Sequence, residues 1–252
     1  MINWTERARA AGIHFGLSAL IAGAAGLLVF GLWYPYPYRE ISGGRELFLL
    51  VVSVDVILGP LITLAIFDRR KPWRELRMDL AMVVAIQLAA LGYGMWTVSV
   101  ARPVHLVFEF DRFRVVHAID VDEGLLAKKP ANVQAMPLAG PTLLAVRPFK
   151  NAAEHAEATM AALGGVELAA RPDLWQPYPS AKAEVLKAAK PVSQLKTRFP
   201  AQAASVDAVL QKAGRKAEAM AYLPLVGRKD FWTAFVDPAT ADVVAFMHLD
   251  SF

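Results

Sequence analysis

The chain has 252 residues and a formal net charge of +4, and 56% of its residues are hydrophobic. This apolar share exceeds the roughly 45–50% of a usual soluble domain. The apolar residues concentrate before residue 101, which indicates membrane segments followed by a separate soluble part. The basic residues lie beside the apolar runs, so membrane topology explains them and nucleic-acid binding is not indicated. The absence of cysteine excludes disulfides and thiolate metal sites.

Three apolar runs are long enough to span a bilayer, which takes about 20 helical residues. They cover residues 13–33, 47–67 and 80–100. The first run follows Arg7 and Arg9 and so resembles a secretory signal, but it is longer than the roughly 7–15 residues of a signal core. We therefore predict a membrane protein with three transmembrane α-helices over residues 1–100, followed by an α+β soluble domain over residues 101–252.

The connection after the first run is aromatic. Trp33, Tyr34, Tyr36 and Tyr38 surround Pro35, and such residues are typical of the interface between membrane and water. The sequence Ser42-Gly43-Gly44 then predicts a turn before the second helix. Glu46 lies near the start of that helix, where a carboxylate suits the positive end of the helix dipole.

The distribution of Lys and Arg predicts the orientation. Residues 68–79, which connect the second and third runs, contain Arg69, Arg70, Lys71, Arg74 and Arg77, whereas the first connection contains only Arg39 and Arg45. Short loops rich in Lys and Arg stay in the cytoplasm. We therefore expect a cytoplasmic amino terminus and a periplasmic domain from residue 101 onward, anchored in a bacterial inner membrane.

Small residues recur in the first run at intervals of four, as Gly12 and Gly16 and as Ala19 and Gly23. This spacing lets two helix backbones approach closely in lipid. We interpret the small residues as packing against the chain's own second and third helices, with docking of another protein's helix as the alternative.

Asp55 lies within the second run, shortly before Gly59 and Pro60. A carboxylate inside a membrane is costly and has to meet a polar partner or the protein interior. One interpretation is a local hydrogen bond to Ser53, Thr63, Gln87 or a carbonyl freed near Pro60, since proline interrupts the helix ladder. The other interpretation is a contact with a polar group on a partner's transmembrane helix.

The sequence after residue 101 predicts a domain large enough for its own core. Runs rich in β-branched and aromatic residues predict strands at 104–110, 113–119, 142–146, 219–226, 231–236 and 243–249. Helices are predicted over 152–163, 180–190 and 201–213, the first of them capped by Asn151. A proline-rich link at 171–179 carries Trp175 and Tyr178, which either form a binding patch or cover the core, and we favour the core.

Signatures of catalysis are missing from the sequence. The histidines lack the spacing of a zinc site, and there is no nucleophile elbow, phosphate loop or dinucleotide fingerprint. His105 and His117 are able to face each other across the predicted hairpin, which we interpret as a chance pairing. We therefore expect no enzymatic activity, no catalytic or metal-binding residues and no cofactor.

Several short motifs follow one another in order over about residues 10–120. They include Trp33-Tyr34-Pro35, Ser42-Gly43-Gly44-Arg45-Glu46-Leu47, Asp55-Val56, Leu58-Gly59-Pro60-Leu61, Leu91-Gly92-Tyr93-Gly94 and Ala101-Arg102-Pro103-Val104. As a set, they resemble the type IV pilin accessory proteins of the TfpX/TfpZ family. The resemblance is dense in this half and weaker beyond Ala127.

The resemblance implies a chaperone-like inner-membrane protein that promotes assembly of one cognate major pilin into type IV pili. Its further partners would be the lipid bilayer and other pilus assembly proteins. The candidate partner-contact or structural residues are Tyr34, Pro35, Tyr36, Ser42, Gly43, Gly44, Arg45, Glu46, Asp55, Gly59 and Pro60. The alternative function is a membrane-anchored periplasmic sensor or ligand-binding protein, for which the chain shows no cytoplasmic output domain.

Overall fold

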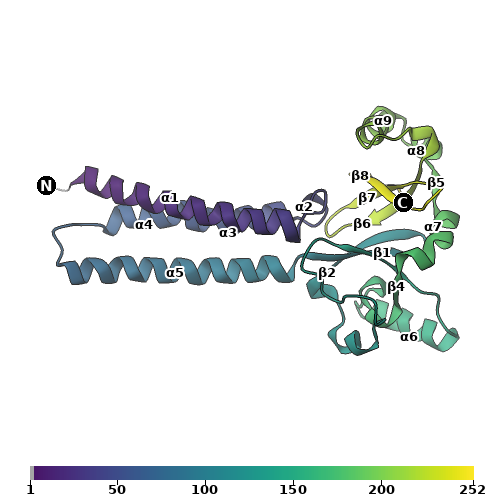
Figure 1. Cartoon of the computed structure of the whole chain (residues 1–252), viewed down its shortest axis with the longest axis horizontal. Coiled ribbons are helices and arrows are strands. Elements are labelled where there is room, and N and C mark those ends of the chain that lie inside the picture. The colour runs from purple at the N-terminus through teal and green to yellow at the C-terminus, as the bar shows by residue number, and fades with distance from the viewer. Residues whose placement is uncertain (1–2) are drawn as a thin grey trace. The chain divides into compact units, whose positions relative to one another are not determined.

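The structure, a computed structural model, describes residues 3–252. The chain forms two compact units, one ending at Ala101 and the other beginning at Arg102. The first unit is made of long helices, and the second combines a β-sheet with shorter helices (Figure 1).

Three helices of the first unit are long and apolar enough to cross a membrane. They run from Trp4 to Trp33, from Gly44 to Ile66 and from Trp73 to Val100. The predicted fold class, three transmembrane helices followed by an α+β domain, is thereby confirmed. The first helix begins before its apolar run, and the Asn3 side chain caps it by accepting a hydrogen bond from the Glu6 amide at 3.4 Å.

Two of the long helices contain a π-helical turn, a segment in which each carbonyl is bonded five residues ahead instead of four. The first helix ends in such a turn, and the second is interrupted by one. The elements are α1 (Trp4–Leu28), the π-helical turn η1 (Val29–Trp33), the short helix α2 (Tyr38–Ile41), α3 (Gly44–Ser53), the π-helical turn η2 (Val54–Leu58), α4 (Gly59–Ile66) and α5 (Trp73–Val100). The second long helix is therefore composite, with η2 between α3 and α4.

The helices of the first unit pack through a small number of close approaches. A cluster of Val29, Tyr34, Phe48, Val51 and Val98 is buried between them. Most other apolar side chains remain exposed, as for Leu27, which is 79% exposed. Such exposure suits a bundle surrounded by lipid, because lipid tails are as apolar as leucine.

The second unit is built on one mixed sheet. Its strands are β1 (Pro103–Glu109), β2 (Arg112–His117), β3 (Thr142–Val146), β4 (Trp175–Pro177), β5 (Lys190–Pro191), β6 (Ala221–Val226), β7 (Phe231–Val236) and β8 (Val243–Met247). Their order is β4-β3-β1-β2-β6-β7-β8, with β5 beside β6. β1 runs parallel to β3 and β2 parallel to β6, and the remaining pairs are antiparallel.

The helices of the second unit follow the predicted positions with one addition. They are α6 (Ala152–Leu163), α7 (Lys182–Ala188), α8 (Val192–Arg198) and α9 (Ala203–Lys212). Asn151 caps α6 as predicted, because its side chain accepts a hydrogen bond from the Glu154 amide at 2.9 Å. The sequence pattern missed α8, which has only seven residues and begins directly after Pro191.

The aromatic residues of the proline-rich link belong to the core. Trp175 is 1% exposed, and its indole N–H donates to the carbonyl of Ala169 at 2.8 Å. Tyr178 is also buried, and its hydroxyl donates to the carbonyl of Ala241. The core interpretation of both residues is confirmed. The link also contains the short strand β4, which was not predicted because prolines are unfavourable in strands.

His105 lies in this core, but it does not face His117. The register of β1 and β2 places His105 opposite Val116. The ring nitrogens of His105 bond to the Thr142 hydroxyl at 2.7 Å and to the carbonyl of Ala135 at 2.9 Å. Burial lowers the pKa of His105 to about 4, so the ring is neutral near pH 7.

Candidate functional site

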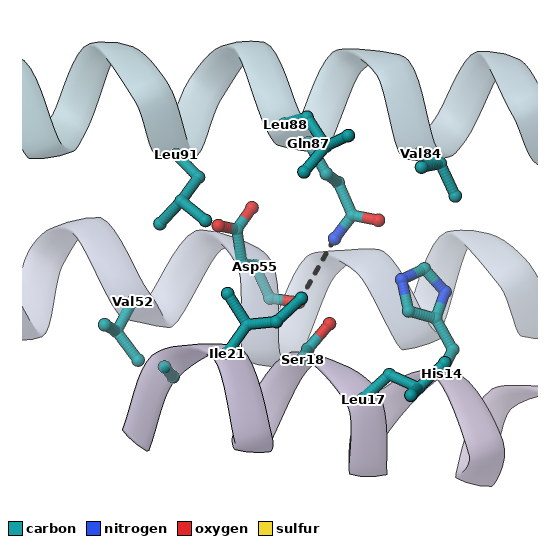
Figure 2. A pocket seen from close by; sticks show the side chains of 11 residues that line it. His14, Leu17, Ser18, Ile21, Val52, Asp55, Val84, Gln87, Leu88 and Leu91 are labelled. Carbon is teal, nitrogen blue, oxygen red and sulfur yellow. Dashed lines mark hydrogen bonds between the residues drawn. The ribbon is translucent and has the colours of Figure 1, made fainter. Parts of the chain in front are cut away.

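Polar side chains from all three long helices gather inside the first unit. A cavity of about 80 Å³ is lined by His14 and Ser18 of α1, Asp55 of η2 and Gln87 of α5, together with aliphatic side chains (Figure 2). Thr63 of α4 adjoins this group through a contact of 2.6 Å between its hydroxyl and Nδ1 of His14. These five residues are called the polar cluster below.

The π-helical turn explains why the backbone carbonyl of Asp55 bonds to the Gln87 side chain. In a π-helical turn the carbonyl of a residue is bonded five positions ahead, which for Asp55 is Pro60. Proline has no N–H to donate. The side-chain amide of Gln87 donates to the Asp55 carbonyl instead, at 3.2 Å. The predicted free carbonyl near Pro60 is therefore present, and another helix satisfies it.

Gly59 makes this contact between helices possible. A Cβ atom at Gly59 would lie 2.0 Å from the Gln87 side-chain nitrogen, closer than real Cβ contacts allow. Gly59 is buried, and Pro60 follows it in the first turn of α4. We infer that Asp55, Gly59 and Pro60 act together. Pro60 leaves the Asp55 carbonyl without a backbone donor, and Gly59 leaves room for the Gln87 amide that bonds to this carbonyl.

The carboxylate of Asp55 is in a different situation from its carbonyl. Asp55 is 9% exposed, and its Oδ1 atom is buried without a hydrogen-bond partner among the described residues. Figure 2 shows the carboxylate directed toward α5, between Leu91 and Gln87. A carboxylate in apolar surroundings is costly unless it is paired. The cavity beside it has room for water or for a small polar group.

The local partners proposed for the Asp55 side chain are engaged elsewhere. The Ser53 hydroxyl donates to the carbonyl of Leu50 at 2.8 Å, and Thr63 pairs with His14. Gln87 bonds to the Asp55 backbone, as described above. A local hydrogen bond therefore accounts for the carbonyl of Asp55 but leaves the Oδ1 atom of the carboxylate unexplained.

Three other predicted residues are structural. Tyr34 is fully buried, and its hydroxyl donates to the carbonyl of Val98 at 3.0 Å, so its assignment to an interfacial belt is wrong. A Cβ atom at Gly44 would lie 2.2 Å from the Tyr34 ring, which explains the glycine there. Gly43 has a φ of 66°, the left-handed conformation that favours glycine. The predicted turn thus brings the chain around the Tyr34 ring.

The remaining predicted residues do not gather into one site. Tyr36 is 69% exposed, Pro35 is half-buried, and Glu46 is exposed in the first turn of α3. Ser42 is buried, and Arg45 lies 3.8 Å from Glu40. Tyr38, in the same connection, is buried enough to raise the pKa of its phenol above the usual range, which keeps it protonated. The connection is therefore a structured turn, separate from the polar cluster.

The small residues of α1 face away from the rest of the chain. A Cβ atom at Gly12, Gly16 or Gly23 would meet no other atom within 4 Å, and Ala19 is exposed. The interpretation that they pack against the chain's own second and third helices is therefore wrong. They form an open face of α1, called the small-residue face below.

Sequence reasoning missed the contribution of α1 to the polar cluster. His14 and Ser18 are one helical turn apart and lie on one face of α1, which is a detectable signal in an otherwise apolar run. Among residues 3–252, no group of three His, Cys, Asp or Glu side chains is placed to hold a metal ion.

Comparison with known proteins identifies the family of this chain. A model for the fimbrial assembly protein FimB matches residues 2–43. The chain is 37% identical to the fimbrial assembly proteins of serogroups I and E1 of Dichelobacter nodosus, over 97% of this chain and 96% of each relative. It is 40% identical to the protein of serogroups C1 and C2 over 45% of this chain and 87% of that relative. No solved structure matches.

The two near-complete matches include both compact units. The similarity therefore reaches beyond the membrane helices, where apolar composition alone raises sequence identity. The chain belongs to the family of fimbrial assembly proteins.

Proposed function

We propose that this protein is a chaperone-like accessory protein of a bacterial inner membrane that assists the assembly of one cognate major pilin into type IV pili. The observation that carries the proposal is the similarity to fimbrial assembly proteins over 97% of the chain. The excess of Lys and Arg between residues 68 and 79 supports an orientation with this loop in the cytoplasm and the second unit, residues 102–252, in the periplasm.

In this proposal, the helical unit contacts the hydrophobic helix of the pilin. The small-residue face of α1 supports such a contact, because it is uncovered by the chain itself and allows close approach of another backbone. The unpartnered Oδ1 of Asp55 supports it independently, because a polar group of a partner helix that reached the cavity would satisfy it.

Two experiments test the proposal. The first is co-purification of the full chain with the cognate pilin from membranes, with exchange of the second unit for that of a relative as the variant. We expect the wild type to retain the pilin and the exchanged chain to lose its preference for it. An interaction that is absent in the wild type would contradict a role in pilin recognition.

The second experiment complements a deletion strain with Asp55 variants and measures surface pili. Asp55→Asn keeps a side chain that can form hydrogen bonds and should preserve part of the assembly. Asp55→Leu, which has the same branching without polarity, should abolish most of it. Equal rescue by both variants would remove Asp55 from the proposed contact, and the expression level of each variant in the membrane is the control.

A polar pocket in the second unit favours the alternative function, a ligand-binding or sensory protein. It has a volume of about 370 Å³ and is lined by Arg114, His117, Asp120 and Arg228, among others. Burial favours the neutral form of Asp120, but hydrogen bonds from His117 and the charge of Arg228 outweigh it and hold the pKa of Asp120 below its usual range.

The location of the pocket agrees with a binding role. β2 and β6 run parallel and pair through Phe113 and Arg114, where β6 ends. The pocket is lined by the last residues of β2 and by Gly227 and Arg228, which follow β6. It therefore lies at the carboxyl ends of two adjacent parallel strands, where ligands commonly bind. Binding of a small anion by the purified protein, lost in Arg228→Gln, together with no binding of pilin, would favour the sensor over the assembly protein.

A further inference from the structure

A larger groove opens at the other end of the helical unit. It has a volume of about 680 Å³ and lies between the first turns of α1, the end of α4 and the beginning of α5. Glu6, Arg9 and Arg69 line its polar part. Aliphatic and aromatic side chains, among them Ile13, Leu17 and Leu80, line the rest. The groove is therefore amphipathic along its length.

This end of the helical unit carries surplus positive charge. The basic residues are Arg7, Arg9, Arg69, Arg70, Lys71, Arg74 and Arg77, and the acidic residues are Glu6, Asp68, Glu75 and Asp79. This end therefore has seven positively charged and four negatively charged side chains. The closest ion pairs join Arg70 to Asp68 at 2.7 Å and Lys71 to Asp79 at 2.6 Å. A partner for the surplus has to be anionic.

Arg9 is the groove residue that lacks such a partner. Arg69 lies 3.6 Å from Glu6, and Arg7 donates to the carbonyl of Ala65 at 2.8 Å and lies 3.6 Å from Asp68. Within residues 3–252, no carboxylate lies within ion-pair distance of Arg9. Its guanidinium is exposed and offers several donors in a planar arrangement that suits a phosphate.

We propose that this groove binds one anionic phospholipid, with the phosphate on Arg9 and an acyl chain along Ile13, Leu17 and Leu80. Basic pockets between transmembrane helices recognise anionic headgroups, and a lipid is the partner that supplies a phosphate and an apolar chain together. A free phosphate would leave the apolar walls of the groove uncovered. A zwitterionic phospholipid offers the same phosphate to Arg9, but it also brings a cation, which the surplus positive charge of this end repels.

The spacing along α1 agrees with the dimensions of a phospholipid. Leu17 follows Arg9 by eight residues, which corresponds to about 12 Å at 1.5 Å per residue. The His14 and Thr63 side chains line the groove between these two levels. A lipid there passes from a charged region through a polar one to an apolar one, in the same order as its phosphate, its ester groups and its acyl chain.

Native mass spectrometry of the full chain in detergent tests the proposal, with phosphatidylglycerol and phosphatidylcholine as probes. We expect the wild type to retain phosphatidylglycerol in preference to phosphatidylcholine, and Arg9→Gln to weaken that retention about fivefold, the effect of roughly 1 kcal/mol for one basic residue near a membrane surface. Glycerol phosphate, which has the anion without the chains, should not compete.

Matched variants separate charge from shape. Arg45→Gln removes another exposed arginine, from the connection before α3, and should retain phosphatidylglycerol as the wild type does. Ala10→Trp fills the groove without changing charge and should lose retention, whereas Met82→Trp, at an exposed position of α5 outside the groove, should not. Equal retention of both lipids by the wild type, or unchanged retention by Arg9→Gln or by Ala10→Trp, would overturn the proposal.

Discussion

The two units of this protein are stabilised in opposite ways. In the unit from Arg102 onward, large side chains such as Trp175, Tyr222 and Phe235 are buried almost completely. In the helical unit most large apolar side chains are exposed, and the contacts between helices depend on small residues such as Gly44, Gly59 and Gly94. Apolar burial is a driving force only where water is the alternative, so the membrane-embedded unit relies on close packing and polar contacts.

This difference predicts where substitutions do damage. In the second unit, removing volume should be most harmful, because it leaves a cavity in a dense core. In the helical unit, adding volume at a glycine should be more harmful than shortening a lipid-facing leucine.

Trp175→Ala should lower the free energy of unfolding of the second unit by about 3–5 kcal/mol, through the lost burial and the cavity left behind. Trp175 is 1% exposed and bonded to Ala169, so its removal also leaves that carbonyl without its donor. Chemical denaturation of the purified chain followed by fluorescence measures the effect. Trp232, which is only half-buried, is the matched control, and Trp232→Ala should cost less than half as much.

Acidification should destabilise the second unit through His105. Burial lowers the pKa of His105 from 6.5 to about 4, so the unfolded chain takes up the proton first as the pH falls. The stabilisation is complete above pH 6.5 and is lost as the pH falls toward 4, in total by about 3 kcal/mol. His105→Gln should have a flatter dependence of unfolding on pH in this window. An equally steep dependence in the variant would exclude His105 as the cause.

Gly59→Ala should destabilise the helical unit by about 1–3 kcal/mol, because the added methyl displaces the Gln87 amide from the Asp55 carbonyl. Gly16→Ala is the control, since its Cβ meets nothing and alanine favours a helix by up to about 1 kcal/mol. Helical circular dichroism during unfolding in detergent measures both. Equal effects of the two variants would contradict the glycine-dependent packing.

Thr63→Val should cost about 0.6 kcal/mol, the average of polar contacts between membrane helices. It keeps the shape of the side chain and removes the hydroxyl that contacts His14 at 2.6 Å. A double-mutant cycle with His14→Ala isolates the pair. A coupling energy near zero would show that the two residues are neighbours without mutual stabilisation.

Much of the architecture was predictable because it depends on local signals. Length and apolarity predicted the three long helices, the capping side chain of Asn151 predicted the start of α6, and β-branched runs predicted six of the strands. Short elements were not predicted. The seven residues of α8 are too few to show a helical pattern, and the prolines around β4 indicate a loop.

The candidate site was less predictable, for a physical reason. Sequence reasoning identified Asp55 and named Gln87 and a carbonyl freed near Pro60 among its partners. It could not tell that Gln87 reaches the carbonyl while the Oδ1 atom remains without a partner, because that depends on how the helices are rotated. The same rotation determines that His14 and Ser18 face inward while the small-residue face points outward.

The π-helical turn Val54–Leu58 fixes that rotation for the second long helix. A turn closed five residues ahead contains one residue more than an α-helical turn, and one residue corresponds to a rotation of about 100°. The wide turn absorbs this extra residue, so deleting one residue within Val54–Leu58 would restore a regular helix and leave the residues beyond it on the same face. Deleting one residue between Gly59 and Thr63, in the regular helix α4, would instead turn Thr63 by about 100° and separate it from His14. The hydropathy of the span would hardly change in either case, so this helix should tolerate a lost residue inside the wide turn better than outside it.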